Sequence, residues 1–100
     1  MVAVFCSSEL MMFELRQLDV ALAAVKDFGA EVLVLSLGFD IFELDPQSKV
    51  AVTREGFARL GERIRSLEVP CLIVQEGGYH LESLEDNARA FFVNAKVWQL

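Results

Sequence analysis

Two short, unbroken apolar segments constrain the fold of this chain more than any other feature of its sequence. Residues Val32 to Leu35 read VLVL and residues Cys71 to Val74 read CLIV. Runs of this length that are rich in β-branched residues are typical of strands buried on both faces of a parallel sheet. Apolar residues at three- and four-residue spacing surround these runs and predict three helices, whose apolar positions span Leu10–Phe28, Phe57–Leu67 and Leu84–Ala95. This alternation predicts an α/β fold with a short parallel sheet and helices on both faces, a three-layer α/β/α arrangement.

Turn and capping residues mark where these elements begin and end. Gly29 is predicted to end the first helix, and Thr53 is predicted to cap the second. Ser83 and Asp86, three residues apart, resemble the capping box of a third helix. The segment Val2–Cys6 is β-branched and aromatic, which is consistent with an extra strand or an ordered arm. No linker or repeat interrupts these elements, so residues 1–100 are expected to form a single α/β domain.

The apolar content of the chain is high for its length, at 54% of 100 residues. A domain of this size buries only roughly 60 to 70% of the surface that its unfolded chain exposes. We therefore expect part of the hydrophobic surface to be covered by a partner.

The charge and cysteine patterns exclude several classes of partner. A net charge of −6 argues against nucleic acid, whose phosphates are bound by clustered Lys and Arg. Basic and acidic residues alternate on the second predicted helix, as on a solvated face: Arg54, Glu55, Arg59, Glu62, Arg63 and Arg65. No run approaches the roughly 18 apolar residues that span a membrane. Cys6 and Cys71 are isolated and lack a CxxC pattern, so we expect a reduced, cytoplasmic protein. Together these patterns predict neither nucleic-acid nor membrane partners.

Polar residues follow both predicted strands at the point where each strand ends. Two parallel strands joined by one crossover end on the same side, so Asp40 and Tyr79 are expected to lie at one edge of the sheet. A carboxylate suits a divalent metal or a base role, and a neutral phenol is a hydrogen-bond donor at pH 7. Gly77 and Gly78 would let the backbone bend sharply beside the tyrosine.

Structural roles are the alternatives for these residues. A carboxylate after a strand is often only a turn or cap residue, and Asp45 before Pro46 is a common way to begin a turn. By spacing alone, a metal at Asp40 is the less common interpretation, and Tyr79 could instead cover the edge of the sheet. His80, the only histidine, could be a ligand or base, but a single histidine near an exposed loop is more often neither.

Two segments, LVLSLGFDIFELDPQSK and VPCLIVQEGGYH, resemble the carboxy-terminal part of the zinc-dependent deacetylase superfamily with the arginase-like fold. That superfamily includes histone deacetylases and acetylpolyamine amidohydrolases. The resemblance runs from about residue 18 to about residue 92, whereas residues 1–15 do not share it. Phe39 and Glu76 are more similar to the acetylpolyamine amidohydrolase branch.

The resemblance implies a role for each motif residue. Asp40 falls on the aspartate that is a zinc ligand in the family, and Tyr79 falls on the tyrosine that donates a hydrogen bond to the substrate carbonyl as it becomes an oxyanion. Gly77 and Gly78 would shape the substrate pocket. His80 matches no catalytic position, and Asp45 is expected to be part of the framework of its loop.

The resemblance also implies what the chain lacks. The family's other zinc ligands and its histidine pair lie upstream of the matching region, and a catalytic zinc needs about three protein ligands. We therefore expect a truncated, carboxy-terminal piece of a zinc hydrolase of acetylated amines, inactive and zinc-free alone, that forms a homodimer or is completed by a second chain. The alternatives are a stand-alone, non-catalytic α/β module that self-associates and a minimal hydrolase active by itself.

Overall fold

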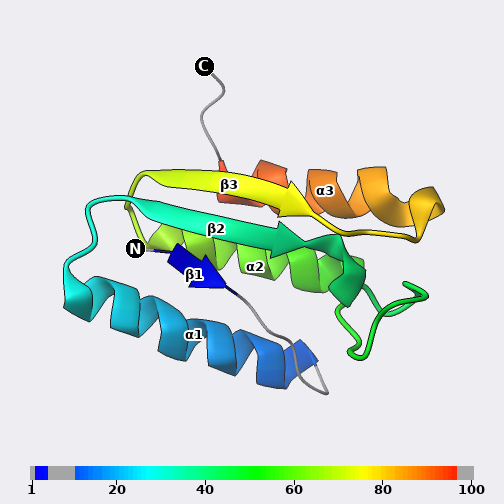
Figure 1. The fold of residues 1–100 in the computed structure, drawn as a ribbon, viewed down its shortest axis with the longest axis horizontal. Coiled ribbons are helices and arrows are strands. Elements are labelled where there is room, and N and C mark those ends of the chain that lie inside the picture. The colour runs from blue at the N-terminus through cyan, green and yellow to red at the C-terminus, as the bar shows by residue number, and fades with distance from the viewer. Residues whose placement is uncertain (1, 5–10, 97–100) are drawn as a thin grey trace.

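A computed structural model describes residues 2–4 and 11–96 of the chain (Figure 1). The elements, in order, are β1 (Val2–Val4), α1 (Met11–Phe28), β2 (Leu33–Gly38), the 3-10 turn η1 (Phe39–Ile41), α2 (Arg54–Ser66), β3 (Cys71–Glu76) and α3 (Leu81–Ala95). Among these described helices, none is long and apolar enough to cross a membrane.

The described strands form one parallel sheet in the order β1-β2-β3. The register pairs Val34 with Val2 on one side and with Leu72 on the other. The prediction of parallel strands is therefore confirmed, and residues 2–4 form the extra strand that was one of the two alternatives. Both main strands run beyond their predicted ends, because the ladder continues to the pair of Gly38 and Glu76.

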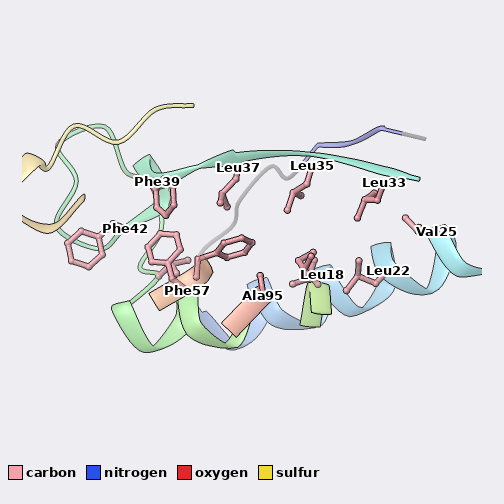
Figure 2. Close-up of a cluster of buried hydrophobic side chains, with 13 residues drawn as sticks. Leu18, Leu22, Val25, Leu33, Leu35, Leu37, Phe39, Phe42, Phe57 and Ala95 are labelled. Carbon is pink, nitrogen blue, oxygen red and sulfur yellow. The ribbon is translucent and has the colours of Figure 1, made fainter. Parts of the chain in front are cut away.

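The core lies between the sheet and the helices (Figure 2). Leu33, Leu35 and Leu37 of β2 are buried, while the residues between them are only half-buried. One continuous cluster joins these leucines to side chains from every described helix: Leu18, Leu22 and Val25 of α1, Phe57 and Ile64 of α2, and Phe91 and Ala95 of α3. All three helices therefore pack on the same face of the sheet.

The other face of the sheet has no helix over it among the described residues. Leu72 is 60% exposed and Val74 is 48% exposed, and the neighbouring Val34 is half-buried. The α/β class and the short parallel sheet are confirmed. Of the three layers expected, however, the described residues form two. The reason is that the buried positions of α1, α2 and α3 all face the alternate leucines of β2.

Two of the predicted helix boundaries are confirmed in atomic detail. Gly29 ends α1 with a positive φ of 74°, and its N–H donates to the carbonyl of Lys26 at 3.0 Å. This is the left-handed ending for which glycine is suited. At the start of α2, the side-chain oxygen of Thr53 accepts a hydrogen bond from the N–H of Gly56 at 3.0 Å.

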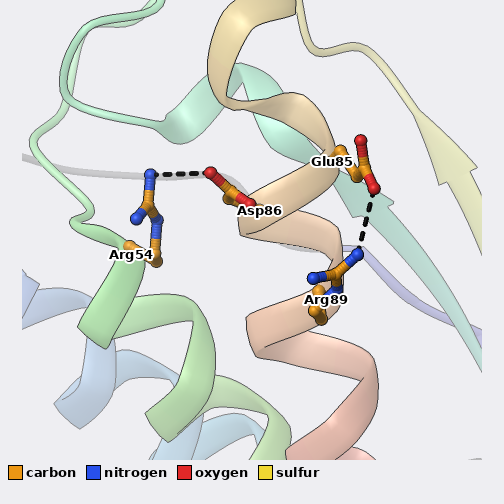
Figure 3. A network of polar contacts seen from close by, with 4 residues as sticks. All are labelled: Arg54, Glu85, Asp86 and Arg89. Atoms are coloured by element: carbon orange, nitrogen blue, oxygen red, sulfur yellow. Dashed lines mark hydrogen bonds and ion pairs between the residues drawn. The ribbon is translucent and has the colours of Figure 1, made fainter.

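The predicted capping box of the third helix is wrong. The helix begins at Leu81, so Ser83 lies inside its first turn, where it is buried. Asp86 points instead toward α2 and pairs with Arg54 at 3.3 Å (Figure 3). The helix starts early because it follows directly on the loop after β3, whose path is fixed by contacts distant in sequence.

A glycine sets how closely α2 and α3 approach. A Cβ atom at Gly61 would overlap the carbonyl oxygen of Phe91 and lie 3.0 Å from the backbone nitrogen of Ala95. The ion pairs near this interface, Arg54 with Asp86 and Glu85 with Arg89 (Figure 3), are at least half exposed and contribute little. Backbone contact at Gly61, rather than charge, determines the spacing of the two helices.

We expect Gly61→Ala to destabilise the chain by about 1 to 3 kcal/mol, because the added methyl group overpacks the α2–α3 interface. This is opposite to the effect of helix propensity, by which alanine is favoured over glycine. Urea unfolding measures the difference. The control Arg54→Ala, at the same interface, should change the free energy of unfolding by no more than about 0.5 kcal/mol. A neutral or stabilising Gly61→Ala would contradict the close approach of the helices.

Candidate functional site

The loops after β2 and β3 lie side by side at one edge of the sheet. Pairing of Gly38 with Glu76 brings the two strand ends together. Asp40 lies in η1, directly after β2, and is half-buried. Tyr79 lies three residues after β3 and is 56% exposed. The expectation that Asp40 and Tyr79 share this edge is met, while their chemical roles remain predictions.

The glycines at this edge allow the Asp40 carboxylate to lie against the backbone. A Cβ atom at Gly77 would be 3.0 Å from Asp40 Oδ1, and one at Gly38 would be 2.6 Å from the same oxygen and 2.8 Å from Glu76 Oε1. The carboxylates of Asp40 and Glu76 therefore come together over Gly38. Gly77 also has a positive φ of 63°, a conformation that favours glycine.

Gly78 is required by its surroundings as well. Its φ is 101°, and a Cβ atom there would lie 2.8 Å from Leu84 Cδ1 and 3.0 Å from the Cβ of Phe39. The backbone conformation and the close neighbours of Gly77 and Gly78 therefore both favour glycine at these positions, whether or not the two residues also shape a substrate pocket.

Asp45 connects the two loops. Its side chain is only 6% exposed, and its Oδ2 atom accepts hydrogen bonds from the N–H of Tyr79 at 2.6 Å and of His80 at 3.2 Å. Its Oδ1 atom accepts from the N–H of Gln47 at 2.8 Å, within its own turn. The expected framework role of Asp45 is confirmed, but it extends further than a turn, because it holds the loop that carries Tyr79.

The surroundings of Asp45 favour its charged form. Burial by itself raises the pKa of the carboxyl group. The hydrogen bonds from the N–H groups of Tyr79, Gln47 and His80, together with the charge of the His80 imidazole, outweigh burial and hold the pKa below its ordinary value of 3.8. Asp45 is therefore a carboxylate throughout the neutral range.

His80 occupies the N-cap position of α3 without a capping bond from its side chain. Its ring centroid lies 5.6 Å from that of Phe42, so the imidazole packs beside the loop after β2. Among the described residues, His80 Nδ1 and Asn87 Oδ1 are the buried side-chain atoms that have no hydrogen-bond partner. This packing agrees with the structural alternative for His80.

The described residues do not by themselves form a metal site. Within residues 2–4 and 11–96, no group of three or more His, Cys, Asp and Glu side chains is arranged to hold a metal ion. Asp40 and Glu76 offer carboxylates, but a catalytic zinc needs about three protein ligands. Cys71 is at the opposite end of β3, where burial raises the pKa of its thiol. Cys6 lies outside the described residues.

Sequence reasoning did not anticipate the long-range contact of Asp45. The pair Asp45 and Pro46 indicates only a local turn, whereas the decisive partners are backbone N–H groups 34 and 35 residues away. The one available signal was the topology, which places the two loops at the same edge. Glu76, which meets Asp40 over Gly38, was noted for its resemblance and not for its position.

We expect Asp45→Asn to lower the free energy of unfolding at pH 7 by about 2 kcal/mol, because buried N–H groups lose a charged acceptor. The folded-state pKa of Asp45 is lowered, so this stabilisation is present above the ordinary aspartate pKa and is lost as the pH falls through the folded-state value. Urea unfolding of both proteins between pH 7 and pH 3 should therefore show curves that converge in acid. The exposed Asp27→Asn is the control, and parallel curves for Asp45→Asn would contradict the expectation.

Most of the chain is similar to one family of known proteins. A model of the histone deacetylase domain matches residues 8–95. An acetylpolyamine amidohydrolase of Burkholderia pseudomallei (strain 1710b) is 58% identical over 86 residues, which are 86% of this chain and 25% of that protein.

Solved structures agree with the sequence relatives. The acetylpolyamine aminohydrolase of Burkholderia pseudomallei superposes with a TM-score of 0.83 at 52% identity, over 86% of this chain and 25% of that one. The HDA15 HD domain superposes with a TM-score of 0.78 at 26% identity, over 91% of this chain and 27% of that one. The chain thus spans about a quarter of the length of these relatives. Because the family model matches most of this chain, the chain belongs to the superfamily of histone deacetylases and acetylpolyamine amidohydrolases, and it corresponds to part of their domain.

Proposed function

We propose that this chain supplies one side of the active site of a zinc-dependent hydrolase of acetylated amines, with acetylated polyamines as the substrate class. Asp40 is one ligand of the zinc ion, and Tyr79 is the hydrogen-bond donor to the substrate carbonyl. The observation that carries the proposal is the meeting of the two motif loops at one edge of the sheet, where Asp45 bonds to the backbone of Tyr79. The names of the relatives from Burkholderia pseudomallei support the substrate class.

The proposed role of Tyr79 follows from its chemistry and exposure. The O–H group of a tyrosine side chain donates a hydrogen bond. Such a donor lowers the barrier when it is already aimed at the oxygen on which negative charge develops. The side chain of Tyr79 is 56% exposed, which leaves it accessible to a substrate at this edge.

The chain alone is proposed to be inactive. Asp40 is one carboxylate ligand, and the described residues around it contain no further set of metal ligands. A second chain that supplies the remaining ligands and the general base would complete the site. The acetylated amine is a substrate only of that completed site.

The second candidate function is a non-catalytic α/β module that self-associates. The observation that favours it is the uncovered face of the sheet, where Leu72 and Val74 are 60% and 48% exposed beside Val34. Adjacent exposed apolar side chains of this kind mark interaction surfaces. In this reading the face binds a second copy of the chain.

A chimera tests the first candidate. Residues 11–95 of this chain replace the matching segment of the Burkholderia pseudomallei amidohydrolase, to which the chain is 58% identical. We expect the chimera to bind zinc and to hydrolyse an acetylated polyamine. Asp40→Ala should remove the zinc, and Tyr79→Phe should keep it while lowering kcat by about 10² to 10³. Metal analysis and steady-state kinetics measure these effects.

The exposed Glu85→Gln is the control for the chimera, because its carboxylate lies at the surface and pairs with the exposed Arg89 at 3.0 Å. It should change neither zinc content nor kcat. If Tyr79→Phe keeps full kcat, or Asp40→Ala keeps full zinc content, the proposed roles of these residues are wrong.

Light scattering tests self-association. We expect the wild-type chain to be a dimer and Val74→Glu to be a monomer, because a charge on the uncovered face opposes burial of that face. The control is Val93→Glu, at a position on α3 that is 64% exposed, which should remain a dimer. Circular dichroism verifies that both variants are folded. A monomeric wild type, or a dimer that is lost only in Val93→Glu, would remove the support for this second candidate.

A further inference from the structure

The position of Tyr79 is determined by its backbone more than by its side chain. The side chain is 56% exposed, so packing holds it only in part. The two residues before it, Gly77 and Gly78, both have positive φ angles, and glycine has the widest conformational freedom of any residue. What fixes the backbone after these glycines is the pair of hydrogen bonds from Tyr79 and His80 to Asp45.

From this geometry we propose that Asp45 is the positioning residue for Tyr79, and that its buried carboxylate sets where the phenol lies relative to the Asp40 carboxylate. This inference rests on the proposed function, because it assigns a partner to the proposed hydrogen-bond donor. It goes further in naming a residue that touches neither the metal nor the substrate.

Asp45 is itself held firmly on the side of the Asp40 loop. Its N–H donates to the carbonyl of Phe42 at 2.9 Å, its own carbonyl accepts from Ser48 at 3.0 Å, and its Oδ1 atom accepts from Gln47. Phe42 is buried and is bonded through its N–H to the carbonyl of Phe39 at 3.3 Å. The backbone from η1 to Asp45 is therefore a continuous set of hydrogen-bonded turns.

A parallel bridge braces the same loop from the other side. Glu43 donates to the carbonyl of Val52 at 2.9 Å, and Val52 donates to the carbonyl of Ile41 at 3.1 Å. Val52 is buried in the core cluster. The loop that carries Asp40 and Asp45 is thus anchored to the core. Through its hydrogen bond to the N–H of Tyr79, Asp45 fixes the backbone of Tyr79 relative to this anchored loop.

The chemistry of the contact requires a carboxylate. One oxygen, Oδ2, accepts two backbone N–H groups at 2.6 and 3.2 Å, and hydrogen bonds to an ionised acceptor are the stronger kind. An asparagine keeps the size of the side chain but brings one oxygen and an NH₂ group, so it cannot satisfy both the Gln47 side and the Tyr79 side. The charge of the His80 imidazole also acts on Asp45 and favours the carboxylate.

Nuclear magnetic resonance of the intact 100-residue chain tests the contact directly. In the wild type we expect a through-hydrogen-bond coupling between the Tyr79 amide nitrogen and the Asp45 carboxyl carbon. In Asp45→Asn, the amide protons of Tyr79 and His80 should move upfield, and their exchange with solvent should accelerate by about tenfold or more. Amides in the β2–β3 ladder, such as that of Leu35, should keep their exchange rates relative to one another.

Tyr79→Phe separates the backbone contact from the phenol. It should leave the amide shift and protection of residue 79 unchanged, because the hydrogen bond uses the main chain. Absence of the coupling in the wild type overturns the inference even if Asp45→Asn does not fold. Unchanged Tyr79 and His80 amides in a folded Asp45→Asn also overturn it.

Kinetics in the chimera separate this inference from the proposed function. Asp45→Asn should keep the zinc, leave KM within about twofold and lower kcat, and combination with Tyr79→Phe should lower kcat no further than Tyr79→Phe alone, since both act through one phenol. If Tyr79→Phe lowers kcat but Asp45→Asn does not, the positioning role is overturned and the proposed function stands. If neither lowers kcat while the amides respond, the proposed function itself fails, and with it the catalytic meaning of the contact.

Discussion

The parallel pairing of β2 with β3 is the constraint on which the rest of the described structure depends. Its register places Gly38 beside Glu76, and this sets which residues can meet once the strands end. The Asp40 carboxylate lies against Gly77, and Asp45 reaches the N–H groups of the following residues. A shift of the pairing by one residue would exchange the two faces of the strand, since side chains alternate between faces. The core and the candidate site therefore share a single determinant.

The one-sided core shows what an apolar run can and cannot predict. VLVL is continuous, and a continuous run is typical of a strand covered on both faces. The described helices cover only the face of Leu33, Leu35 and Leu37, and they leave Leu72 and Val74 of the next strand largely exposed. The continuous apolar run thus predicts that both faces of the sheet are buried. It does not indicate which element, or which chain, buries the second face. The three-layer prediction, drawn from the strands, and the expectation of a partner, drawn from the apolar content, therefore both bear on this uncovered face.

Periodicity and strand ends were sufficient to predict the elements and the shared edge, because both depend on local spacing. They were not sufficient for the start of α3. The pattern of Ser83 and Asp86 is locally a good capping box, yet the helix begins at Leu81 and Ser83 lies buried within its first turn. The path into the helix is decided by Asp45, 35 residues before His80. A contact of that separation has no signature in spacing, so local rules placed the start of the helix too late, although they identified the face that packs on the core.

The contact of Asp45 also bears on how an incomplete site can remain organised. The described residues already hold the backbone of Tyr79 relative to the Asp40 loop, through the two glycines, the turns around Asp45 and the bridge to Val52. These contacts hold the two loops together without using Asp40 or the phenol of Tyr79 as a partner. A preformed pair of groups loses less conformational entropy when the remaining groups arrive than a flexible pair would. In the proposed function, a completing chain would meet one side of the site already in place, and its binding energy would go into assembling the metal ligands rather than into ordering Tyr79.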